Sequence, residues 1–430
     1  MKKTLFLLLA LCLLLVSCGE STPKTTAGET GETAETAQTG ESLTVKVKNI
    51  MTEIPDYELQ PGASVEEMRQ MAVKAMRDEL NVKWMPAKAF HYQKTGSVGG
   101  QTFQYILNRV YAGLPYSNGS GGLMQFLTYY NFETGVVDGL DFSDVNSVIG
   151  NTCAESVMWG WNAVCSTVKG QYVTWAMTVQ NGVYPVAPIT YDTSIQTFRE
   201  IDTVDICKAC GEDTFFEAYA NTRPADGVVM YNKGETGAYE ETAGHAMMIV
   251  SEPVVVRNGG KIDPDQSYVL IQDQRAGVLK TSNYVEDNGQ KAHFSGRIEE
   301  KYTFRKLFDE HYMPVTPAEF LGQVPYVPSA ANLSGEITNS EELLAATVKA
   351  THSICVIRLK VQTEGREETE SVRLIKEKSI MDGSAENFPL SEFAAFMRRN
   401  FKKGKDNHIT VSVLLSTGRS FTVLDTSISE

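Results

Sequence analysis

The chain has 430 residues, of which 42% are hydrophobic, and its formal net charge is −14 at pH 7. This length suits two or three domains, and the hydrophobic content excludes a globally disordered chain. The negative charge disfavours nucleic acid as a partner, because a phosphate-binding face needs clustered Lys and Arg.

The first residues have the composition of an export signal. Lys2 and Lys3 precede an apolar run over 5–16, and the sequence Ser17-Cys18-Gly19 follows. The run is too short to span a bilayer. The segment resembles a bacterial lipoprotein signal, which implies cleavage before Cys18 and lipid attachment to that cysteine. We therefore expect residues 1–18 to be a lipoprotein signal peptide and the protein to be lipid-anchored in the extracytoplasmic cell envelope; an ordinary secretory signal is the alternative.

Three segments are expected after the signal. Residues 19–42 are nearly all Gly, Glu, Ser, Thr, Ala and Gln without periodicity, which is typical of a disordered tether. Residues 43–328 are expected to form the main domain, and residues 329–430 a small β-rich domain.

Two helices are predicted in the first part of the main domain. The capping box Ser64-Val65-Glu66-Glu67 predicts a helix whose apolar residues recur at helical spacing. A second helix is predicted from Thr102 to Tyr111, ending at Gly113-Leu114-Pro115-Tyr116, with a loop over 117–122.

Cys153 is predicted to open a further helix. Thr152 and Glu155 form another capping box, which puts Cys153 at the first helical position. The partial positive charge at a helix start favours the thiolate form of a cysteine there. A helix with a break at Gly211 is predicted over 203–219.

From Gly227 the pattern changes to strands. We predict strands over 228–231, 245–250, 254–256 and 268–272, with a turn at 258–260. Helices followed by an antiparallel-looking sheet indicate an α+β fold. Pro314, Pro317, Pro325 and Pro328 suggest a linker. Beyond it we predict strands over 353–362, 370–380, 408–416 and 420–425 and a helix over 391–401.

Five cysteines remain once Cys12 leaves with the signal and Cys18 carries lipid; they are Cys153, Cys165, Cys207, Cys210 and Cys355. An odd number in an exported protein leaves at least one thiol outside the intrachain disulfides, and Cys153 is our choice for it. No second ligand pair accompanies Cys207 and Cys210, so helical packing or a disulfide to Cys165 is favoured over a metal site. No metal and no cofactor are expected.

The residues that carry chemistry are Cys153 and His245, the latter at the start of an apolar strand. A histidine that can take or hold a proton completes a nucleophile–base pair with the thiol. Asp273, at the end of the next long strand, is the candidate to orient the imidazole. Gln272 is the alternative, because a register slip of one residue exchanges the two faces of a strand.

Four stretches in this order resemble the NlpC/P60 family of bacterial cell-wall cysteine peptidases: Gly113-Leu114-Pro115-Tyr116, Asn151-Thr152-Cys153-Ala154-Glu155, Arg223-Pro224-Ala225-Asp226-Gly227-Val228 and Gly244-His245-Ala246-Met247-Met248. The resemblance covers about residues 100–275 and implies a papain-like fold, with helices packed on an antiparallel sheet and Tyr116 near the active site.

The departures from the family leave the substrate open. Thr152 replaces the family's aspartate before the cysteine, Ala154-Glu155 replaces its Ser-Gly, and the spacing to His245 is wider. The strands of His245 and Asp273 also look like those of papain. No papain-type oxyanion glutamine is present, since Ser147 stands at its place; Asn146, Asn151 or the backbone N–H of Cys153 is the candidate.

The resemblance implies a surface lipoprotein that acts as a cysteine hydrolase on amide bonds, with peptidoglycan stem peptides as substrate. A papain-type protein peptidase is the second interpretation and a transglutaminase-like enzyme the third. A catalytically inactive papain-like fold that binds an envelope ligand is the non-enzymatic one. We expect the protein to be a monomer. Besides its substrate, its expected partner is the membrane, which it contacts through its lipid.

Overall fold

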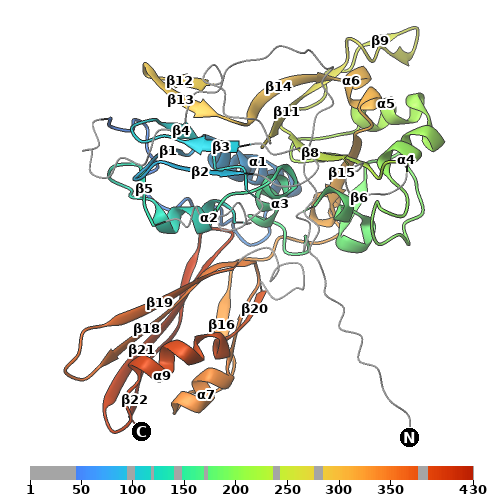
Figure 1. Ribbon diagram of the computed structural model, residues 1–430. Helices are drawn as coiled ribbons and strands as arrows, with labels where there is room; N and C mark the ends of the chain where they lie inside the picture. The colour runs from blue at the N-terminus through green and yellow to red at the C-terminus, as the bar shows by residue number, and fades with distance from the viewer. Residues whose placement is uncertain are drawn as a thin grey trace, which may run out of the picture.

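The computed structural model describes residues 45–93, 102–117, 121–139, 148–168, 173–235, 243–275, 284–375 and 386–429. Within them, helices alternate with sheets whose strand pairs are mostly antiparallel (Figure 1). The predicted α+β class is therefore confirmed. The predicted signal peptide, tether and lipidated Cys18 lie outside the described residues.

A six-stranded antiparallel sheet forms the centre of the main part, in the order β14-β11-β8-β7-β15-β6. Its strands are β6 (Val183–Pro185), β7 (Gly227–Asn232), β8 (Ala243–Ile249), β11 (Tyr268–Asp273), β14 (Arg297–Thr303) and β15 (Met313–Pro317). The strands predicted at 228–231, 245–250 and 268–272 are thus confirmed. The strand predicted at 254–256 is wrong, since this stretch makes one isolated bridge, between Val254 and Tyr268.

Two long helices pack on one face of this sheet. They are α1 (Val65–Asn81), which begins at the predicted capping box of Ser64, and α3 (Cys153–Asn162), which begins at that of Thr152. Gly160 of α3 lets the elements approach closely, because a Cβ there would lie 2.8 Å from Met248 Cε of β8 and 3.0 Å from Met76 Cβ of α1. The helix of Cys153 is therefore held directly against the strand of His245.

The remaining helices of the main part are shorter. They are α2 (Leu123–Phe126), α4 (Thr203–Cys210), α5 (Glu212–Ala220) and α6 (Phe304–Asp309), with 3-10 turns η1 (Leu127–Tyr129), η2 (Thr174–Ala176), η3 (Val179–Asn181) and η5 (Ala318–Leu321). Gly211, with φ at +78°, separates α4 from α5 as predicted.

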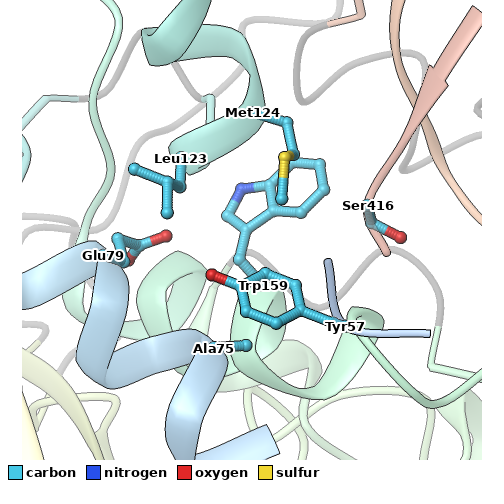
Figure 2. Close-up of a pocket in the computed structure, with 7 residues that line it drawn as sticks. All are labelled: Tyr57, Ala75, Glu79, Leu123, Met124, Trp159 and Ser416. Carbon is cyan, nitrogen blue, oxygen red and sulfur yellow. The ribbon is translucent and has the colours of Figure 1, made fainter. Parts of the chain in front are cut away.

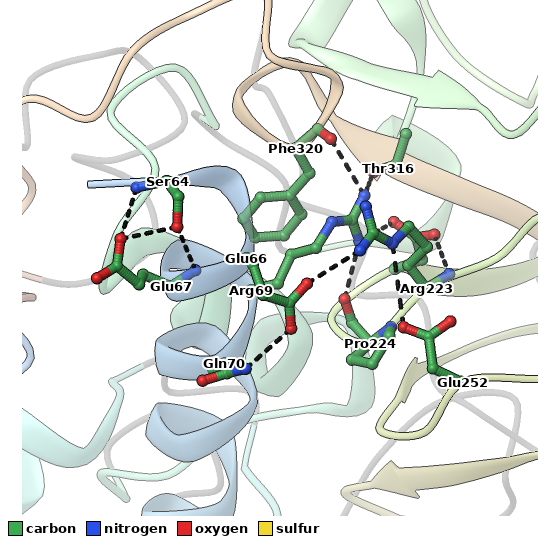
Figure 3. A network of polar contacts seen from close by, with 11 residues as sticks. Ser64, Glu66, Glu67, Arg69, Gln70, Arg223, Pro224, Glu252, Thr316 and Phe320 are labelled. Atoms are coloured by element: carbon green, nitrogen blue, oxygen red, sulfur yellow. Dashed lines mark hydrogen bonds and ion pairs between the residues drawn. The ribbon is translucent and has the colours of Figure 1, made fainter. Parts of the chain in front are cut away.

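A buried arginine fixes α1 to the sheet (Figure 3). Arg69 Nη1 donates to Asp226 Oδ1 at 2.7 Å and to the carbonyl of Pro224 at 2.8 Å, and Nη2 donates to the carbonyl of Phe320 at 3.2 Å. Burial raises the pKa of Asp226, although the charge of Arg69 opposes the rise. One guanidinium therefore donates hydrogen bonds to the turn before β7 and to the turn after β15, and links both to α1.

A second sheet, ordered β12-β13-β4-β1-β5, lies beside α1 and α3 (Figure 1). Its strands are β1 (Lys83–Pro86), β4 (Tyr111–Ala112), β5 (Val136–Val137), β12 (Tyr284–Asp287) and β13 (Gln290–Phe294). Two hairpins accompany the sheets: β2 (Phe90–Gln93) with β3 (Thr102–Tyr105), and β9 (Arg257–Asn258) with β10 (Lys261–Ile262).

The helix predicted from Thr102 to Tyr111 is wrong. Residues 102–105 form β3, and Tyr111 begins β4. Aromatic packing outweighs the helical spacing here, because Trp84 lies 5.3 Å, between ring centroids, from both Tyr105 and Tyr111. Pro314 and Pro317 are also not linker residues; they lie in β15, where their carbonyls still accept hydrogen bonds, as Pro314 does from Val186 at 3.0 Å.

The C-terminal part has sheets of its own, ordered β16-β17-β20 and β19-β18-β21-β22. Its elements are β16 (Ala331–Leu333), α7 (Ser340–Ala345), β17 (Thr347–Ala350), β18 (Ile354–Thr363), β19 (Thr369–Leu374), β20 (Asn387–Pro389), η7 (Leu390–Phe393), α9 (Ala394–Asn400), β21 (Asp406–Leu415) and β22 (Ser420–Ser429). The four strands and the helix predicted here are present; the predicted strand over 370–380 ends at Leu374, and residues 376–380 are not described.

The C-terminal part docks on the end of α3. Ser416 Oγ donates to the carbonyl of Asn162 at 2.7 Å, and the backbone N–H of Tyr57 donates to the carbonyl of Thr417 at 2.8 Å. Among the described helices, none is both long and apolar enough to cross a bilayer.

Candidate functional site

His245 and Asp273 meet at the end of the central sheet. β8 and β11 are antiparallel neighbours, with Ile249 opposite Ile271 and Met248 opposite Gln272. This register brings His245 Nε2 to 2.6 Å from Asp273 Oδ2. Asp273 is fully buried, and His245 is 8% exposed. The structure therefore brings together the two strand residues that the sequence paired.

Arg297 completes this cluster and was missed by the sequence analysis. It begins β14, directly opposite Asp273, and its Nε donates to Asp273 Oδ1 at 2.8 Å while Nη2 donates to Oδ2 at 2.5 Å. A charge-assisted pair in which one guanidinium binds both carboxylate oxygens is among the strongest polar contacts in proteins. Arg297 Nη2 also lies 3.3 Å from His245 Nε2.

The alternation of side chains along β14 predicts that Arg297 faces solvent. Its neighbours at the same parity, Glu299 and Lys301, are exposed. The register between β11 and β14 shifts between Ile271 and Asp273, and Glu299 has φ at +56°. Such a bulge moves one residue to the other face of a strand, so Arg297 points inward like Tyr302.

The cluster keeps Asp273 ionised. Burial alone raises the pKa of its carboxyl, but hydrogen bonds and charge from Arg297 and His245 outweigh burial, so the pKa of Asp273 lies well below its ordinary value. The same contact raises the pKa of Arg297, against the effect of burial. An ionised carboxylate only accepts hydrogen bonds, so His245 Nε2 carries the proton that it shares with Asp273.

The other ring nitrogen of His245 is the one left for proton transfer. Within the described residues, His245 Nε2 donates to Asp273, and the contact to Arg297 Nη2 at 3.3 Å involves the same nitrogen but is no hydrogen bond when Nε2 carries a proton. Nδ1 is not among the fully enclosed polar atoms that lack a partner. Tyr312 packs edge-on against the ring, with centroids 6.2 Å apart. The ring is therefore held by a carboxylate at its Nε2 edge and by Tyr312 against its side.

Cys153 stands at the first position of α3, as predicted. Thr152 Oγ1 accepts from the backbone N–H of Glu155, whose carboxylate accepts from the backbone N–H of Thr152. Gly150 permits this turn, because a Cβ there would lie 2.1 Å from the carbonyl oxygen of Pro115. The helix start is thus fixed by local sequence.

The state of the sulfur differs from our expectation. Cys153 is fully buried and disulfide-bonded, whereas Cys165, Cys207, Cys210 and Cys355 are free. Choosing Cys153 as the thiol outside any disulfide was wrong for this structure, and so was a disulfide between Cys165 and the Cys207–Cys210 pair. A disulfide sulfur has no proton to share, and the described residues show no hydrogen bond between Cys153 and His245.

Two hydrogen bonds connect the start of α3 to the end of β11. Gln274 Nε2 donates to the carbonyl of Leu114 at 2.7 Å, and the backbone N–H of Asn151 donates to the carbonyl of Pro115 at 3.1 Å. Leu114 and Pro115 belong to the predicted turn that ends at Tyr116. This turn therefore bridges the residue after Asp273 and a residue just before Cys153.

The three other predicted site residues point into the protein. Tyr116 is fully buried and stacks on Phe103, with centroids 5.9 Å apart. The fully buried amide of Asn151 donates to Glu79. Gln272 donates to the carbonyl of Val73 in α1 at 3.2 Å, on the strand face opposite Asp273. The substrate or oxyanion roles expected for Tyr116, Asn151 and Gln272 stay predictions. Asn146, another oxyanion candidate, lies outside the described residues.

No group of three or more His, Cys, Asp or Glu side chains among the described residues is arranged to hold a metal ion. Comparisons of the chain with known protein families, with curated proteins and with solved structures found no match in any of the three.

Proposed function

We propose that this protein is a cysteine hydrolase of amide bonds, with Cys153 as nucleophile and His245 as acid and base. The observation that carries the proposal is the 2.6 Å bond between His245 Nε2 and Asp273, which leaves Nδ1 as the transferable position. The second support is the packing of α3, which begins at Cys153, against the strand of His245.

In the proposed reaction, the thiolate of Cys153 attacks the amide carbon and forms an S–C bond. His245 Nδ1–H protonates the leaving amine as the C–N bond breaks. Neutral His245 then takes a proton from water, whose oxygen attacks the thioester carbon, and the Cys153 thiolate leaves. Asp273 holds the imidazole in the required tautomer, as the third member of a catalytic triad does.

The reaction requires Cys153 as a free thiol. In the proposed lipoprotein Cys12 leaves with the signal and Cys18 carries lipid, and the four other cysteines are free, so the mature chain keeps no intrachain disulfide to Cys153. In the unprocessed chain a dithiol reductant would open the disulfide and become oxidised itself. We therefore expect hydrolysis by the unprocessed protein, and not by the mature one, to depend on added thiol reductant.

The proposed localisation is the cell envelope, with residues 1–18 as the signal peptide and Cys18 as the lipidated residue. Radiolabelled palmitate should enter the wild-type chain and not Cys18→Ala. Equal labelling of the two would refute the lipoprotein assignment.

The proposed substrate is the peptidoglycan stem peptide, by the resemblance of four stretches to NlpC/P60 peptidases. A protein substrate is the alternative, because the strands of His245 and Asp273 also resemble those of papain. Mass spectrometry of products from purified cell wall and from casein separates the two.

The decisive experiment compares Cys153→Ala with the matched control Cys210→Ala, both assayed with reductant. Cys210 lies half-buried in α4, outside the proposed site. We expect Cys153→Ala to abolish hydrolysis and Cys210→Ala to leave it unchanged. Full activity in Cys153→Ala would rule the mechanism out.

A binding protein without catalysis is the second candidate, and the complete burial of Cys153 in a disulfide favours it. Alkylation of the reduced protein at pH 5.5 discriminates the two, because an activated thiol reacts there and an ordinary one does not. Failure of Cys153 to react would favour the binding protein.

A further inference from the structure

A buried carboxyl lies beneath the first turn of α3. Glu79 of α1 is 2% exposed and accepts a hydrogen bond from the side-chain amide of Asn151, two residues before Cys153. The backbone N–H of Leu123, at the start of α2, also bonds to it, and the hydroxyl of Ser156 faces it. One side chain therefore joins α1, α2 and the beginning of α3.

A cavity of about 20 Å³ lies beside this carboxyl, large enough for one water molecule (Figure 2). It is lined by Tyr57, Ala75, Glu79, Leu123, Met124, Trp159 and Ser416. Trp159 Nε1 is enclosed and has no hydrogen-bond partner among the described residues. In Figure 2 the indole nitrogen lies on the side of Leu123 and Glu79. A water molecule in this cavity would satisfy Trp159 and give Glu79 a further polar neighbour.

The surroundings of Glu79 favour the neutral acid. Burial raises the pKa of Glu79 to about 8, even though the polar groups of Ser156, Asn151 and Leu123 beside it lower the pKa. The acidic groups nearest to Glu79 are Asp78 on α1, Tyr57 before it and Glu155 on α3. The cations of α1 bind elsewhere: Arg69 to Asp226, Lys74 to Asp78 and Arg77 to Glu299. The cavity-lining residues of α2 and of the β21–β22 turn are Leu123, Met124 and Ser416, which carry no charge. None of the groups that line the cavity is a cation that would stabilise the carboxylate.

We propose that Glu79 is a positioning residue of the hydrolase site: by its hydrogen bond with Asn151 it holds the first turn of α3, and with it the sulfur of Cys153. This inference rests on the proposed function. Ionisation of Glu79 would place a negative charge at a helix start whose partial positive charge stabilises a thiolate. Thiolate reactivity at Cys153 therefore falls when Glu79 loses its proton.

The test measures alkylation of Cys153 in the reduced full-length protein between pH 6 and 9.5, by mass spectrometry of its peptide. Alkylation of Cys210 in the same sample is the internal reference. For each protein we take the ratio of the alkylation rate of Cys153 to that of Cys210. Above pH 8 we expect this ratio to be roughly tenfold lower in the wild type than in Glu79→Gln, which is the scale of effect that one neighbouring like charge produces. Indistinguishable ratios across this pH range would overturn the proposal.

Glu79→Ala tests positioning separately, because it removes the acceptor of Asn151. Glu79→Ala should lower the rate ratio at every pH, and Glu79→Gln should restore it. If a folded Glu79→Ala protein has the rate ratio of the wild type at pH 6.5, the positioning role is overturned. Alkylation needs no substrate, so these results are independent of whether hydrolysis occurs. Absence of hydrolysis would remove the proposed function and leave the coupling between Glu79 and Cys153 measurable.

Discussion

Replacing Arg297 by Met should destabilise the protein strongly, because it leaves Asp273 buried without its counter-ion. Arg297 Nε and Nη2 bind both carboxylate oxygens, at 2.8 and 2.5 Å, and Asp273 is fully buried. Breaking a buried ion pair from one side typically costs about 3–5 kcal/mol. Since domains are stable by about 5–15 kcal/mol, this loss is a large share of the total.

The loss of stability in Arg297→Met should depend on pH, and the pKa of Asp273 gives the direction of this dependence. The pKa of Asp273 is lowered in the folded wild type, so the stability that the carboxylate contributes is present above its ordinary value of 3.8 and is lost as pH falls through the folded value. In Arg297→Met, burial is no longer offset by the guanidinium, and the pKa of Asp273 should rise. The variant then relieves its buried charge by protonation, so its deficit should be smaller at pH 4.5 than at pH 7.5.

Urea denaturation followed by tryptophan fluorescence measures the effect at both pH values. Arg297→Met combined with Asp273→Asn is the control, because it removes the orphaned charge and should recover more than half of the loss. A deficit below about 1 kcal/mol at pH 7.5, on the scale of an exposed ion pair, would refute the reasoning.

Three further predictions concern stability. Glu79→Gln should remove a pH dependence of the free energy of unfolding. The pKa of Glu79 is raised from 4.5 to about 8, so the stability that its protonated form contributes is complete below pH 4.5 and is lost as pH rises through about 8. The loss amounts to about 1.4 kcal/mol per pH unit. Equal slopes in urea denaturation of the two proteins would contradict this. Gly244→Ala should cost about 1–3 kcal/mol, because its Cβ would lie 2.2 Å from Thr174 Oγ1, and Thr174→Ala in the same chain should restore part of the loss. Ser64→Ala removes the cap of α1 and should cost about 0.5–2 kcal/mol by thermal denaturation, whereas Ser64→Asp should cost little.

Local signals in the sequence predicted local structure well. The capping boxes at Ser64 and Thr152 mark the starts of α1 and α3, and Gly211 separates α4 from α5. These features depend on contacts within four residues, which the sequence displays directly. Where long-range packing competes with local spacing, as at Thr102–Tyr111, the prediction failed, because β3 pairs with β2 and its Tyr105 packs on Trp84.

The pairing of His245 with Asp273 was partly visible in the sequence. Each residue lies at the end of an apolar strand, but the choice between Asp273 and Gln272 depends on register, and the pairing of Met248 with Gln272 settles it. The resulting contact at 2.6 Å leaves Gln272 directed at α1.

The sequence by itself determined where α1 and α3 begin, and that Cys153 stands at the start of a helix and His245 near the start of a strand, because caps and alternation act over a few residues. Only the tertiary structure decided that Arg297 binds Asp273 and that Glu79 lies under the start of α3. Both contacts join segments far apart in the chain, and a strand bulge or a helix crossing sets each of them. The opposite pKa shifts of Asp273 and Glu79 likewise depend on the packed whole: burial raises both pKa values, and only beside Asp273 do Arg297 and His245 reverse the rise.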